Sequence, residues 1–396
     1  MKFFVVGIDD NKTQHFSAEV KEIIHTHRVF SGGLRHREIV EDLLPTDHQW
    51  IEIKVPLDEV FEQYKQYDEI VVFASGDPLF FGFANIIQRK IPEAELTVYP
   101  FFNSLQLLAH RLLLPYQDMH IVSLTGRPWH KFDEALIIGY DKIGILTDNK
   151  AHTPAFIAQR MLHYGYDNYS MSVGELLGNN ESEKVGTYRL DDVISRDFSF
   201  PNNIILQKTK HRPRRFGIPD QEFNLLNERA KMITKMPIRL PSLSVLELRE
   251  KTTLWDVGFC TGSVSVEAKL QFPHLVIHSF EIREEGRALI ESNACKFGAP
   301  GIASYIGDFM TMDVSPLPPP DAVFIGGHGG KMKEMIAKIN KVLQPNGVIV
   351  FNSVSEESYQ LFKEGVEENK LILEQVIAVT IDDNNTIQVM KAIKTK

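Results

Sequence analysis

The sequence predicts an α/β protein with a two-lobed α/β unit, a doubly wound parallel domain after it, and a β-hairpin at the C-terminus. Short apolar runs alternate with helical segments along nearly the whole chain, which is the pattern of α/β folds. At 396 residues and 43% hydrophobic content, the chain can form two or three packed domains. Two glycine-bearing turns, residues 75–82 and 256–263, each follow a predicted strand.

Residues 1–207 predict the two-lobed unit. Several runs in this region are short, apolar and bounded by Gly, Asp or Pro, as buried strands are. These predicted strands are residues 3–6, 70–74, 96–99, 121–124, 143–146 and 204–206. We expect the break between the lobes near Leu114 and Pro115, after a helical segment that begins near Ser104.

A concentrated basic run, residues 208–215, contains one proline and interrupts the apolar pattern. It predicts a linker between a first domain, residues 1–207, and a second domain, residues 216–396. A solvated connector is one interpretation, because runs of like charge normally stay in water. A basic rim that guides a polycarboxylate into a neighbouring cleft is the other.

Residues 216–396 predict a more regular α/β domain, in which parallel strands are joined by right-handed crossovers. Its predicted strands are residues 254–257, 276–280, 303–306, 322–325 and 348–351, and its predicted helices are residues 264–270, 284–297, 331–343 and 356–368. Two closing β-rich runs, residues 371–380 and 386–393, flank the turn-forming residues 382–385 and predict the hairpin.

Composition narrows the class of protein. No apolar run approaches the roughly 20 residues that a membrane helix needs, and the start of the chain turns polar too quickly for a secretory signal, so we expect a cytoplasmic protein without a membrane partner. A net charge of -9 argues against nucleic acid as the main partner. Two cysteines form neither a disulfide framework nor a zinc site. His25 and His27 could share one face of a strand, but they lack a third ligand, so we expect no metal.

The second turn predicts a nucleoside site. Ligands of open α/β sheets bind beyond the carboxyl ends of the strands, where the first strand turns into its helix. Asp256 ends a predicted strand, and Gly258 and Gly262 let the backbone come close to a ligand because they lack a Cβ. Glu281 ends the next strand, where it could accept hydrogen bonds from both ribose hydroxyls, and Asp308 follows the strand after that, where an adenine edge would be read.

Cys260 occupies the middle of this turn, where a third glycine would be usual in a dinucleotide fold. A pyrophosphate depends on that glycine for its close approach, whereas a nucleoside joined to an amino acid tolerates a small side chain better. The turn therefore favours S-adenosyl-L-methionine over NAD as the cofactor. A nicotinamide-dependent oxidoreductase remains the rival class of enzyme, and a non-enzymatic tetrapyrrole-binding protein is the alternative among binding modules.

Five segments of the second domain carry a family resemblance: residues 217–220, 232–235, 255–258, 261–268 and 324–327. In these segments the domain resembles the decarboxylating precorrin methyltransferase domain of cobalamin biosynthesis. The resemblance implies a Rossmann-like methyltransferase fold and an S-adenosyl-L-methionine site. The site residues that it implies, with the acidic residue before the turn, are Thr234, Asp256, Gly258, Phe259, Cys260, Thr261, Gly262, Glu281 and Asp308.

The first turn and its neighbours resemble the tetrapyrrole methylase domain that methylates C5 in the same pathway. The resemblance is carried by residues 3–8, 31–36, 76–82, 103–106, 123–128 and 146–148, in that order. The cofactor-binding residues that we infer for this half are Gly76, Asp77, Pro78, Leu79, Asn103 and Ser104. One departure is plain, because Asp9, Asp10 and Asn11 stand where the family has a glycine-proline-glycine loop.

Together the halves resemble the bifunctional C5,C15-methyltransferase family. This resemblance implies methylation of a precorrin or cobalt-precorrin at C5 by the first half. For the second half it implies methylation at C15 with loss of the C12 acetate carboxyl. We also expect a homo-oligomer.

A reduced tetrapyrrole carbon is electron-rich and needs no nucleophilic side chain, so positioning should supply much of the rate. His328 is a candidate proton donor, or a loop histidine with only solvent or backbone partners. Gly326 and Gly327 could form a wall of the substrate pocket. Substrate carboxylates could be held by the basic residues Arg35, His36 and Arg127, for which an ordinary surface position is the alternative. The phenylalanine pairs 80–81 and 101–102 could line the tetrapyrrole pocket or belong to the core.

Overall fold

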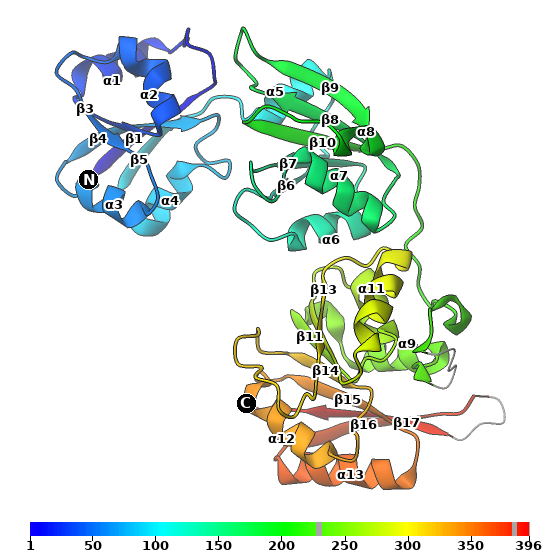
Figure 1. Cartoon of the computed structure of the whole chain (residues 1–396). Coiled ribbons are helices and arrows are strands. Elements are labelled where there is room, and N and C mark those ends of the chain that lie inside the picture. The colour runs from blue at the N-terminus through cyan, green and yellow to red at the C-terminus, as the bar shows by residue number, and fades with distance from the viewer. Residues whose placement is uncertain (227–231, 382–385, 396) are drawn as a thin grey trace. The chain divides into compact units, whose positions relative to one another are not determined.

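The computed structural model describes residues 1–226, 232–381 and 386–395 (Figure 1). The chain folds into two compact units. The first unit comprises Met1–Arg127, Tyr140–Gln159 and Asn168–Lys210, and the second comprises Pro128–Gly139, Arg160–Asp167 and His211–Lys396. Each unit therefore draws on more than one stretch of the sequence.

The first lobe of the first unit is a parallel five-stranded sheet with the order β3-β2-β4-β1-β5. Its strands are β1 (Lys2–Ile8), β2 (Val29–Gly32), β3 (Gln49–Glu52), β4 (Glu69–Ser75) and β5 (Glu95–Tyr99). Helices α1 (Ala18–Thr26) and α2 (Leu34–Val40) pack on one face of the sheet, and α3 (Leu57–Tyr64) and α4 (Phe83–Lys90) pack on the other (Figure 1). Buried on both faces, β1 and β4 are nearly continuous apolar runs, as parallel strands are.

The second lobe is a mixed five-stranded sheet with the order β6-β7-β10-β8-β9. Its strands are β6 (His120–Ser123), β7 (Lys142–Leu146), β8 (Tyr169–Glu175), β9 (Lys184–Arg189) and β10 (Asn202–Lys208). Only β6 and β7 pair in parallel, and the other neighbours are antiparallel. Along the chain, the helices between these strands are α6 (His130–Ile138), α7 (Pro154–His163) and α8 (Leu190–Ile194), of which α6 and the end of α7 belong to the second unit.

The predicted break between the lobes is wrong by one helix. Helix α5 (Ser104–Arg111) packs its buried Leu105 and Leu108 with Met119, Leu177 and Ile205 of the second lobe. The break therefore lies between β5 and α5, before the helix and not near Leu114. The sequence misled here because an amphipathic helix shows which of its faces is buried, not which sheet that face covers.

The second unit contains a seven-stranded sheet with the order β13-β12-β11-β14-β15-β17-β16. Five parallel strands, β11 (Thr253–Val257), β12 (Val276–Glu281), β13 (Ile302–Ile306), β14 (Ala322–Ile325) and β15 (Val348–Ser353), are followed by the antiparallel pair β16 (Ile372–Val379) and β17 (Ile387–Ile393). Helices α12 (Met332–Val342) and α13 (Glu356–Glu368) cover one face. Helices α9 (Met236–Val245) and α10 (Ser263–Gln271) cover the other face, and α11 (Glu285–Phe297) lies beside α10.

The α/β class, the strands predicted in both halves and the C-terminal hairpin are confirmed within a few residues. The predicted turn at residues 382–385 lies outside the described residues. The strand interpretation of His25 and His27 is wrong, because His25 lies in the last turn of α1 and His27 is its C-cap. Among the residues that the structure describes, no three His, Cys, Asp or Glu side chains are placed to hold a metal ion.

A buried ionic network ties the segment before α9 to helix α10. The Arg239 guanidinium and the Glu267 carboxylate are both fully buried, with Nε donating to Oε2 at 3.0 Å. Arg239 also donates to the carbonyl of Thr234 at 2.7 Å and to the carboxylate of Asp220 at 3.3 Å. Glu267 in turn accepts the backbone N–H of Gly217 at 2.6 Å. These contacts satisfy both buried charges, which would otherwise be costly. They also fix the chain that leads to Thr234.

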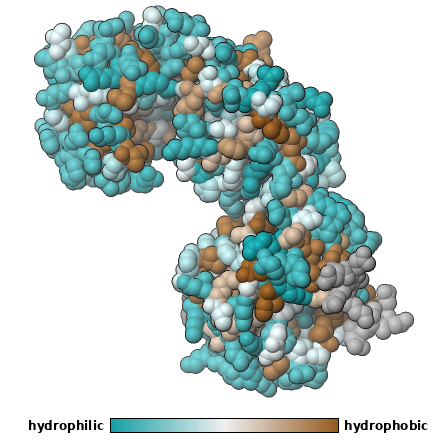
Figure 2. Space-filling view, viewed as in Figure 1, coloured by the Kyte–Doolittle hydropathy of each residue, from teal (hydrophilic) through white to brown (hydrophobic). Residues whose placement is uncertain are grey.

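No helix in the described ranges is long and apolar enough to cross a bilayer. The face drawn in Figure 2 is mostly hydrophilic, with hydrophobic residues in small patches, as is usual for folded chains.

Breaking the buried network of Arg239 and Glu267 should destabilise the second unit. Glu267→Gln leaves the Arg239 charge buried without its counter-ion, so we expect a loss of about 3 kcal/mol in the free energy of unfolding. Urea denaturation followed by fluorescence measures the change. Glu291→Gln, on the exposed side of α11, is the matched control and should change the free energy by less than about 0.5 kcal/mol. An equal effect of the two substitutions would contradict the stabilising role of the network.

Candidate functional site

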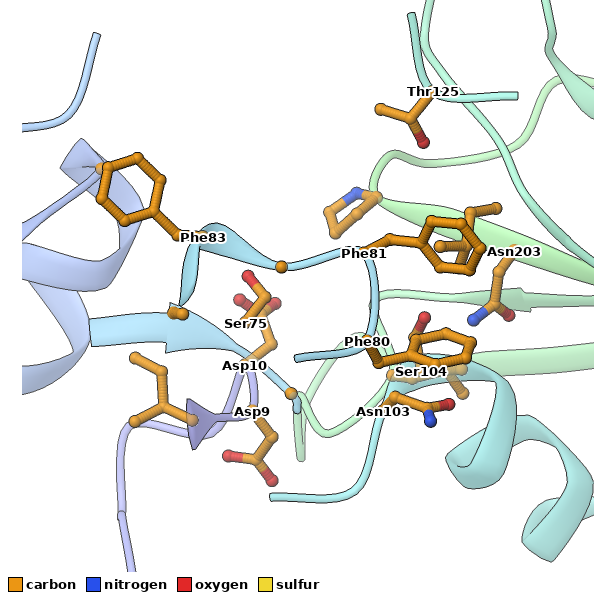
Figure 3. Close-up of a pocket in the computed structure, with 18 of the residues that line it drawn as sticks. Asp9, Asp10, Ser75, Phe80, Phe81, Phe83, Asn103, Ser104, Thr125 and Asn203 are labelled. Atoms are coloured by element: carbon orange, nitrogen blue, oxygen red, sulfur yellow. The ribbon is translucent and has the colours of Figure 1, made fainter. Parts of the chain in front are cut away.

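The first unit contains a cavity of about 600 Å³ that is lined from both of its sheets. The carboxyl ends of β1 and β4 and the turn after β4 contribute from one side, and the start of α5 and the ends of β6, β7 and β10 contribute from the other (Figure 3). Of the residues predicted for this half, it brings together Gly76, Asn103, Ser104, Arg35, His36 and Arg127. A cavity of this size can hold a nucleoside or part of a larger ligand.

Gly76 sits where two backbone segments meet. Its φ is +63°, and a Cβ on this residue would lie 2.9 Å from the α-carbon of Asn103. Gly7, in β1, is equally constrained, since a Cβ there would lie 2.0 Å from the Gly76 carbonyl oxygen. Only glycine fits this crossing, so the turn stays close to the sheet edge and its backbone is presented to the cavity.

Asn103 and Ser104 lie at the N-terminus of α5. The Asn103 side chain accepts the N–H of Gln106 at 2.9 Å, and the Gln106 side chain accepts the N–H of Asn103 at 3.0 Å. This capping box fixes the first turn of the helix at the cavity wall. The predicted contacts of Asp77, Pro78 and Leu79 are not seen at the wall, because these residues do not line the cavity. The carboxylate of Asp77 instead accepts the N–H of Leu79 at 2.9 Å.

Arg35 and His36 converge on Ser75 at the end of β4. Arg35 donates to the Ser75 Oγ at 3.0 Å, and His36 Nε2 lies 2.8 Å from the same oxygen. His36 Nδ1 accepts the N–H of Gly33, so the ring proton is on Nε2 and is donated to Ser75. Burial, together with the neighbouring Arg35 charge, lowers the pKa of His36 to about 4. His36 is therefore a neutral donor in this cluster and not a cation.

Arg127 and Phe81 form the aromatic side of the cavity. The Arg127 guanidinium lies 5.0 Å from the centre of the Phe81 ring, which is within the range of a cation–π contact. Phe81 has a φ of +53° and is 47% exposed, so a bulky side chain is held in a strained conformation with its ring uncovered. Such strain is a feature of ligand sites. Figure 3 shows Phe80 and Phe81 on the side of Asn203, and Phe83 on the opposite side.

Two residues that the sequence analysis missed give the cavity a polar floor. Asn203 is 1% exposed, and neither its Nδ2 nor its Oδ1 atom has a hydrogen-bond partner in the described part of the chain. The Ser123 Oγ is likewise buried without a partner among the described residues. Ser123 and Asn203 are each paired with Leu146 across the sheet, so the three side chains share one face. A buried amide without partners is costly, and a polar ligand in the cavity would satisfy it. The only sign of Asn203 in the sequence is that a polar residue stands directly before the apolar run 204–206.

The second unit contains a cavity of about 560 Å³ at the carboxyl ends of its parallel strands. Of the predicted residues, it brings together Thr234, Gly258, Phe259, Cys260, Glu281, Asp308, Gly326, Gly327 and His328. This is the edge where open α/β sheets bind ligands. Asp256, Thr261 and Gly262 do not line the cavity.

The turn after β11 approaches the Gly326–Gly327 loop so closely that a Cβ on Gly258, whose φ is +81°, would lie 2.8 Å from the N atom of Gly327. Cys260 has a φ of +50°, which is the left-handed conformation that normally belongs to glycine. The turn therefore keeps the usual backbone path although one glycine is replaced. Gly262 serves helix packing, since a Cβ there would lie 2.4 Å from a side-chain carbon of Ile290.

Glu281 is 2% exposed and is held by several donors at once. It accepts the N–H of Cys260 at 2.9 Å, and Arg283 donates to both of its oxygens, at 2.9 and 3.0 Å. Burial works against ionisation, but these hydrogen bonds and the Arg283 charge lower the pKa of Glu281 overall. Ribose hydroxyls would therefore meet a carboxylate that already accepts hydrogen bonds from Arg283. The Arg283 side chain is 36% exposed, so it has space in which to move when such hydroxyls bind.

Asp256 is buried at the end of β11, beneath the turn that holds Gly258. It is 1% exposed, and the Ser265 hydroxyl donates to its Oδ2 at 2.5 Å. Burial raises the pKa of Asp256 to about 7. Asp308 lies in the turn after β13, where it accepts the N–H of Met310 at 2.8 Å and pairs with Lys331 at 3.3 Å.

His328 lies in the glycine-rich loop after β14 and faces the cavity. Its Nδ1 accepts the N–H of Gly330 at 3.2 Å, so in the neutral ring the proton is on Nε2. The ring meets Phe351 edge to face at 5.7 Å. Burial lowers the pKa of His328, which leaves Nε2–H as a neutral donor at physiological pH.

The matched family model and the sequence relatives are precorrin methyltransferases. A family model described as "Precorrin methyltransferase domain" matches residues 226–390. The precorrin-6Y C(5,15)-methyltransferase [decarboxylating] of Sinorhizobium sp is 30% identical over 358 residues, which cover 89% of this chain and 84% of that protein. The protein of the same name from Mycobacterium tuberculosis (strain CDC 1551 / Oshkosh) is 26% identical, with 89% and 87% covered. A solved structure titled precorrin-6y C5,15-methyltransferase, from Geobacter metallireducens GS-15, has 30% identity and a TM-score of 0.42, and covers 47% of this chain and 100% of that chain.

Two cavities of nucleoside size, each beside a glycine turn at the carboxyl end of parallel strands, are typical of an α/β enzyme that binds a nucleoside twice. The domain match makes it a methyltransferase. The chain belongs to the family of precorrin-6Y C5,15-methyltransferases (decarboxylating). Enzymes of this family use S-adenosylmethionine as the methyl donor. Neither a nicotinamide-dependent oxidoreductase nor a non-enzymatic tetrapyrrole carrier is supported.

The neutral state of His36 should make stability depend on pH. The pKa of His36 is about 4 in the folded chain and about 6.5 in an unfolded one. Between these values the unfolded chain binds more protons, so the free energy of unfolding falls as pH falls from about 6.5 to about 4. His36→Gln should reduce that slope, as measured by urea denaturation at several pH values. Equal slopes in the two proteins would show that His36 is already charged in the fold.

Proposed function

We propose that this chain methylates a precorrin-type tetrapyrrole twice, at C5 in the first unit and at C15 in the second, with loss of the C12 acetate carboxyl in the second reaction. Residues 1–207 form the C5-methylating domain, and residues 216–396 form the C15-methylating, decarboxylating domain. The observation that carries the proposal is the presence of two separate nucleoside-sized cavities in one member of this family.

Both cavities fit S-adenosylmethionine, which supplies a methyl group on a positively charged sulfur. In the first cavity the Asn203 amide and the Ser123 hydroxyl have no hydrogen-bond partner among the described residues, so a polar ligand could bind them. In the second cavity the Glu281 carboxylate lies beside a turn in which Gly258 has no room for a Cβ. The predicted cofactor-binding residues that line the walls are proposed to make these contacts, whereas Asp256 and Gly262 hold the second turn in shape.

In the first cavity the substrate would lie between charged and aromatic groups. Arg35, Arg127 and the Ser75–His36 pair can donate charge-assisted or neutral hydrogen bonds to the carboxylate arms of a tetrapyrrole. The uncovered ring of Phe81 offers an apolar surface to the macrocycle. Positioning of the acceptor carbon would then supply much of the rate.

In the second cavity His328 is placed to donate a proton. His328 lines the cavity from the loop after β14, and its Nδ1 accepts the N–H of Gly330, which leaves Nε2 without that contact. Loss of carbon dioxide from the acetate leaves an electron pair that must be protonated. The proton would come from the imidazolium form of His328, in which both ring nitrogens carry hydrogen, and its loss leaves a neutral ring.

The partner that we propose is thus a precorrin or cobalt-precorrin, with no nucleic acid partner, in a homo-oligomer that works in the cytoplasm. The basic residues 208–215 are proposed as the linker. Part of their charge is used locally, because Arg215 donates to Glu222 at 2.6 Å.

Damage to one cavity should remove one methylation. Gly76→Ala places a Cβ against Asn103 in the first cavity, and Glu281→Ala removes the carboxylate from the second. After incubation with precorrin-6B and labelled methyl donor, mass spectrometry should show loss of the C5 methyl from the first variant. The second variant should lose the C15 methyl and the release of carbon dioxide. If either substitution abolishes both methylations, the assignment of one reaction to each unit is wrong.

Removal of the His328 imidazole should slow decarboxylation. We expect His328→Gln to lower the rate of carbon dioxide release about 100-fold. S-adenosylhomocysteine should still bind, because the substitution leaves the Gly258 turn and Glu281 unchanged. Quenched reactions measure the release of carbon dioxide, and calorimetry measures the binding of S-adenosylhomocysteine. Full C15 methylation and decarboxylation by His328→Gln would remove His328 from the mechanism.

A further inference from the structure

The proposed methylation at C5 releases a proton, and few groups in the first cavity could accept it. Transfer of a methyl group to a carbon that carries hydrogen ends with loss of that hydrogen as a proton. Of the described residues that line the cavity, only Asp9, Asp10 and His36 can accept a proton at neutral pH. The surroundings of these three side chains decide between them.

His36 has no free ring nitrogen. Its Nδ1 accepts the N–H of Gly33 at 3.3 Å, and its Nε2–H is donated to Ser75 at 2.8 Å. A proton could enter only after the first of these contacts was broken, in an environment that already disfavours the charged ring.

Asp9 is used to shape its own loop. One of its oxygens accepts the N–H of Asn11 at 3.1 Å and the side-chain amide of Gln14 at 2.7 Å. Its other oxygen lies beside Gly178, close enough that a Cβ on that glycine would come within 3.0 Å. The carboxylate of Asp9 thus closes a turn after β1.

Asp10 is different, because both of its oxygens have only long contacts. Arg35 Nε lies 3.5 Å from Oδ1, and the Asn179 amide lies 3.5 Å from Oδ2. The side chain is 11% exposed and lines the cavity. Ile8 pairs with Ser75 across β1 and β4, so Asp10 lies beyond the same sheet edge as the Gly76 turn. Figure 3 shows Asp10 at this edge, near the end of β4.

We propose that Asp10 accepts the proton that leaves C5 in the first methylation, which rests on the proposed function. The sulfur–methyl bond breaks with its electron pair on sulfur, and a π pair of the macrocycle forms the new bond from C5 to the methyl carbon. The C5–H bond then breaks, its electron pair returns to the ring, and the proton passes to the Asp10 carboxylate. Arg35 holds that carboxylate in place through its contact with Oδ1.

The test uses the full chain with Glu281→Ala, in which only the first cavity acts. Asp10→Asn keeps the shape of the side chain and removes its basicity. Three quantities are measured: affinity for S-adenosylhomocysteine, the single-turnover rate of C5 methylation of precorrin-6B, and exchange of the C5 hydrogen with D₂O when S-adenosylhomocysteine replaces the methyl donor. We expect the affinity to stay within about twofold while methylation and exchange both fall about 100-fold.

Asp42→Asn, on an exposed turn of the same lobe, is the matched control and should leave all three quantities unchanged. Asp10→Glu keeps a carboxylate and should retain both methylation and exchange within about tenfold. The proposal is overturned if Asp10→Asn exchanges and methylates at the parent rate. It is also overturned if the loss follows Asp9→Asn instead, or if Asp10→Glu binds S-adenosylhomocysteine but is as slow as Asp10→Asn.

Failure of the proposed function would be recognised separately. If the parent chain with Glu281→Ala adds no methyl group at C5, the assignment of that reaction to the first unit fails before Asp10 is considered. If the parent chain methylates C5 and Asp10→Asn does so equally fast, only the role of Asp10 fails.

Discussion

Both cavities depend on one geometric constraint, which is the close crossing of two backbone segments at the carboxyl end of a parallel sheet. In the first unit Gly7 and Gly76 meet at this crossing, and in the second unit Gly258 meets Gly327. A Cβ at any of the first three positions would collide with backbone atoms at less than 3 Å. Because no side chain separates the segments, main-chain groups form one wall of each cavity, and bulkier residues are displaced to its rim.

Around these crossings, ion pairs fix the polar side chains in place. The pair of Arg239 and Glu267 fixes the chain that carries Thr234 to the second cavity. Arg283 holds the carboxylate of Glu281 at the end of β12, and Arg35 bridges Ser75 and Asp10 in the first cavity. The two cavities differ in what remains unsatisfied. Within the described residues, the first has a buried amide without partners, whereas the Glu281 carboxylate of the second accepts hydrogen bonds on both oxygens.

The aromatic residues of the first unit divide between packing and exposure. Phe80 packs with the apolar residues under α5, whereas Phe81 and Phe102 are about half exposed beside the cavity. The packing interpretation is thus confirmed for Phe80, which is partly buried, and the tetrapyrrole-pocket interpretation stays a prediction for the uncovered ring of Phe81.

The sequence by itself determined the α/β class, most of the strands, the C-terminal hairpin and the family, because these depend on local apolar patterning and on glycine-bearing turns. It also placed Gly76, Gly258 and Glu281 at the ends of strands. Tertiary structure alone decided that α5 covers the second lobe and that Asp77 does not line the cavity. It likewise revealed Asn203 and Arg283, whose importance lies in what surrounds them. Those features depend on contacts between residues far apart in the chain, which periodicity and spacing do not encode.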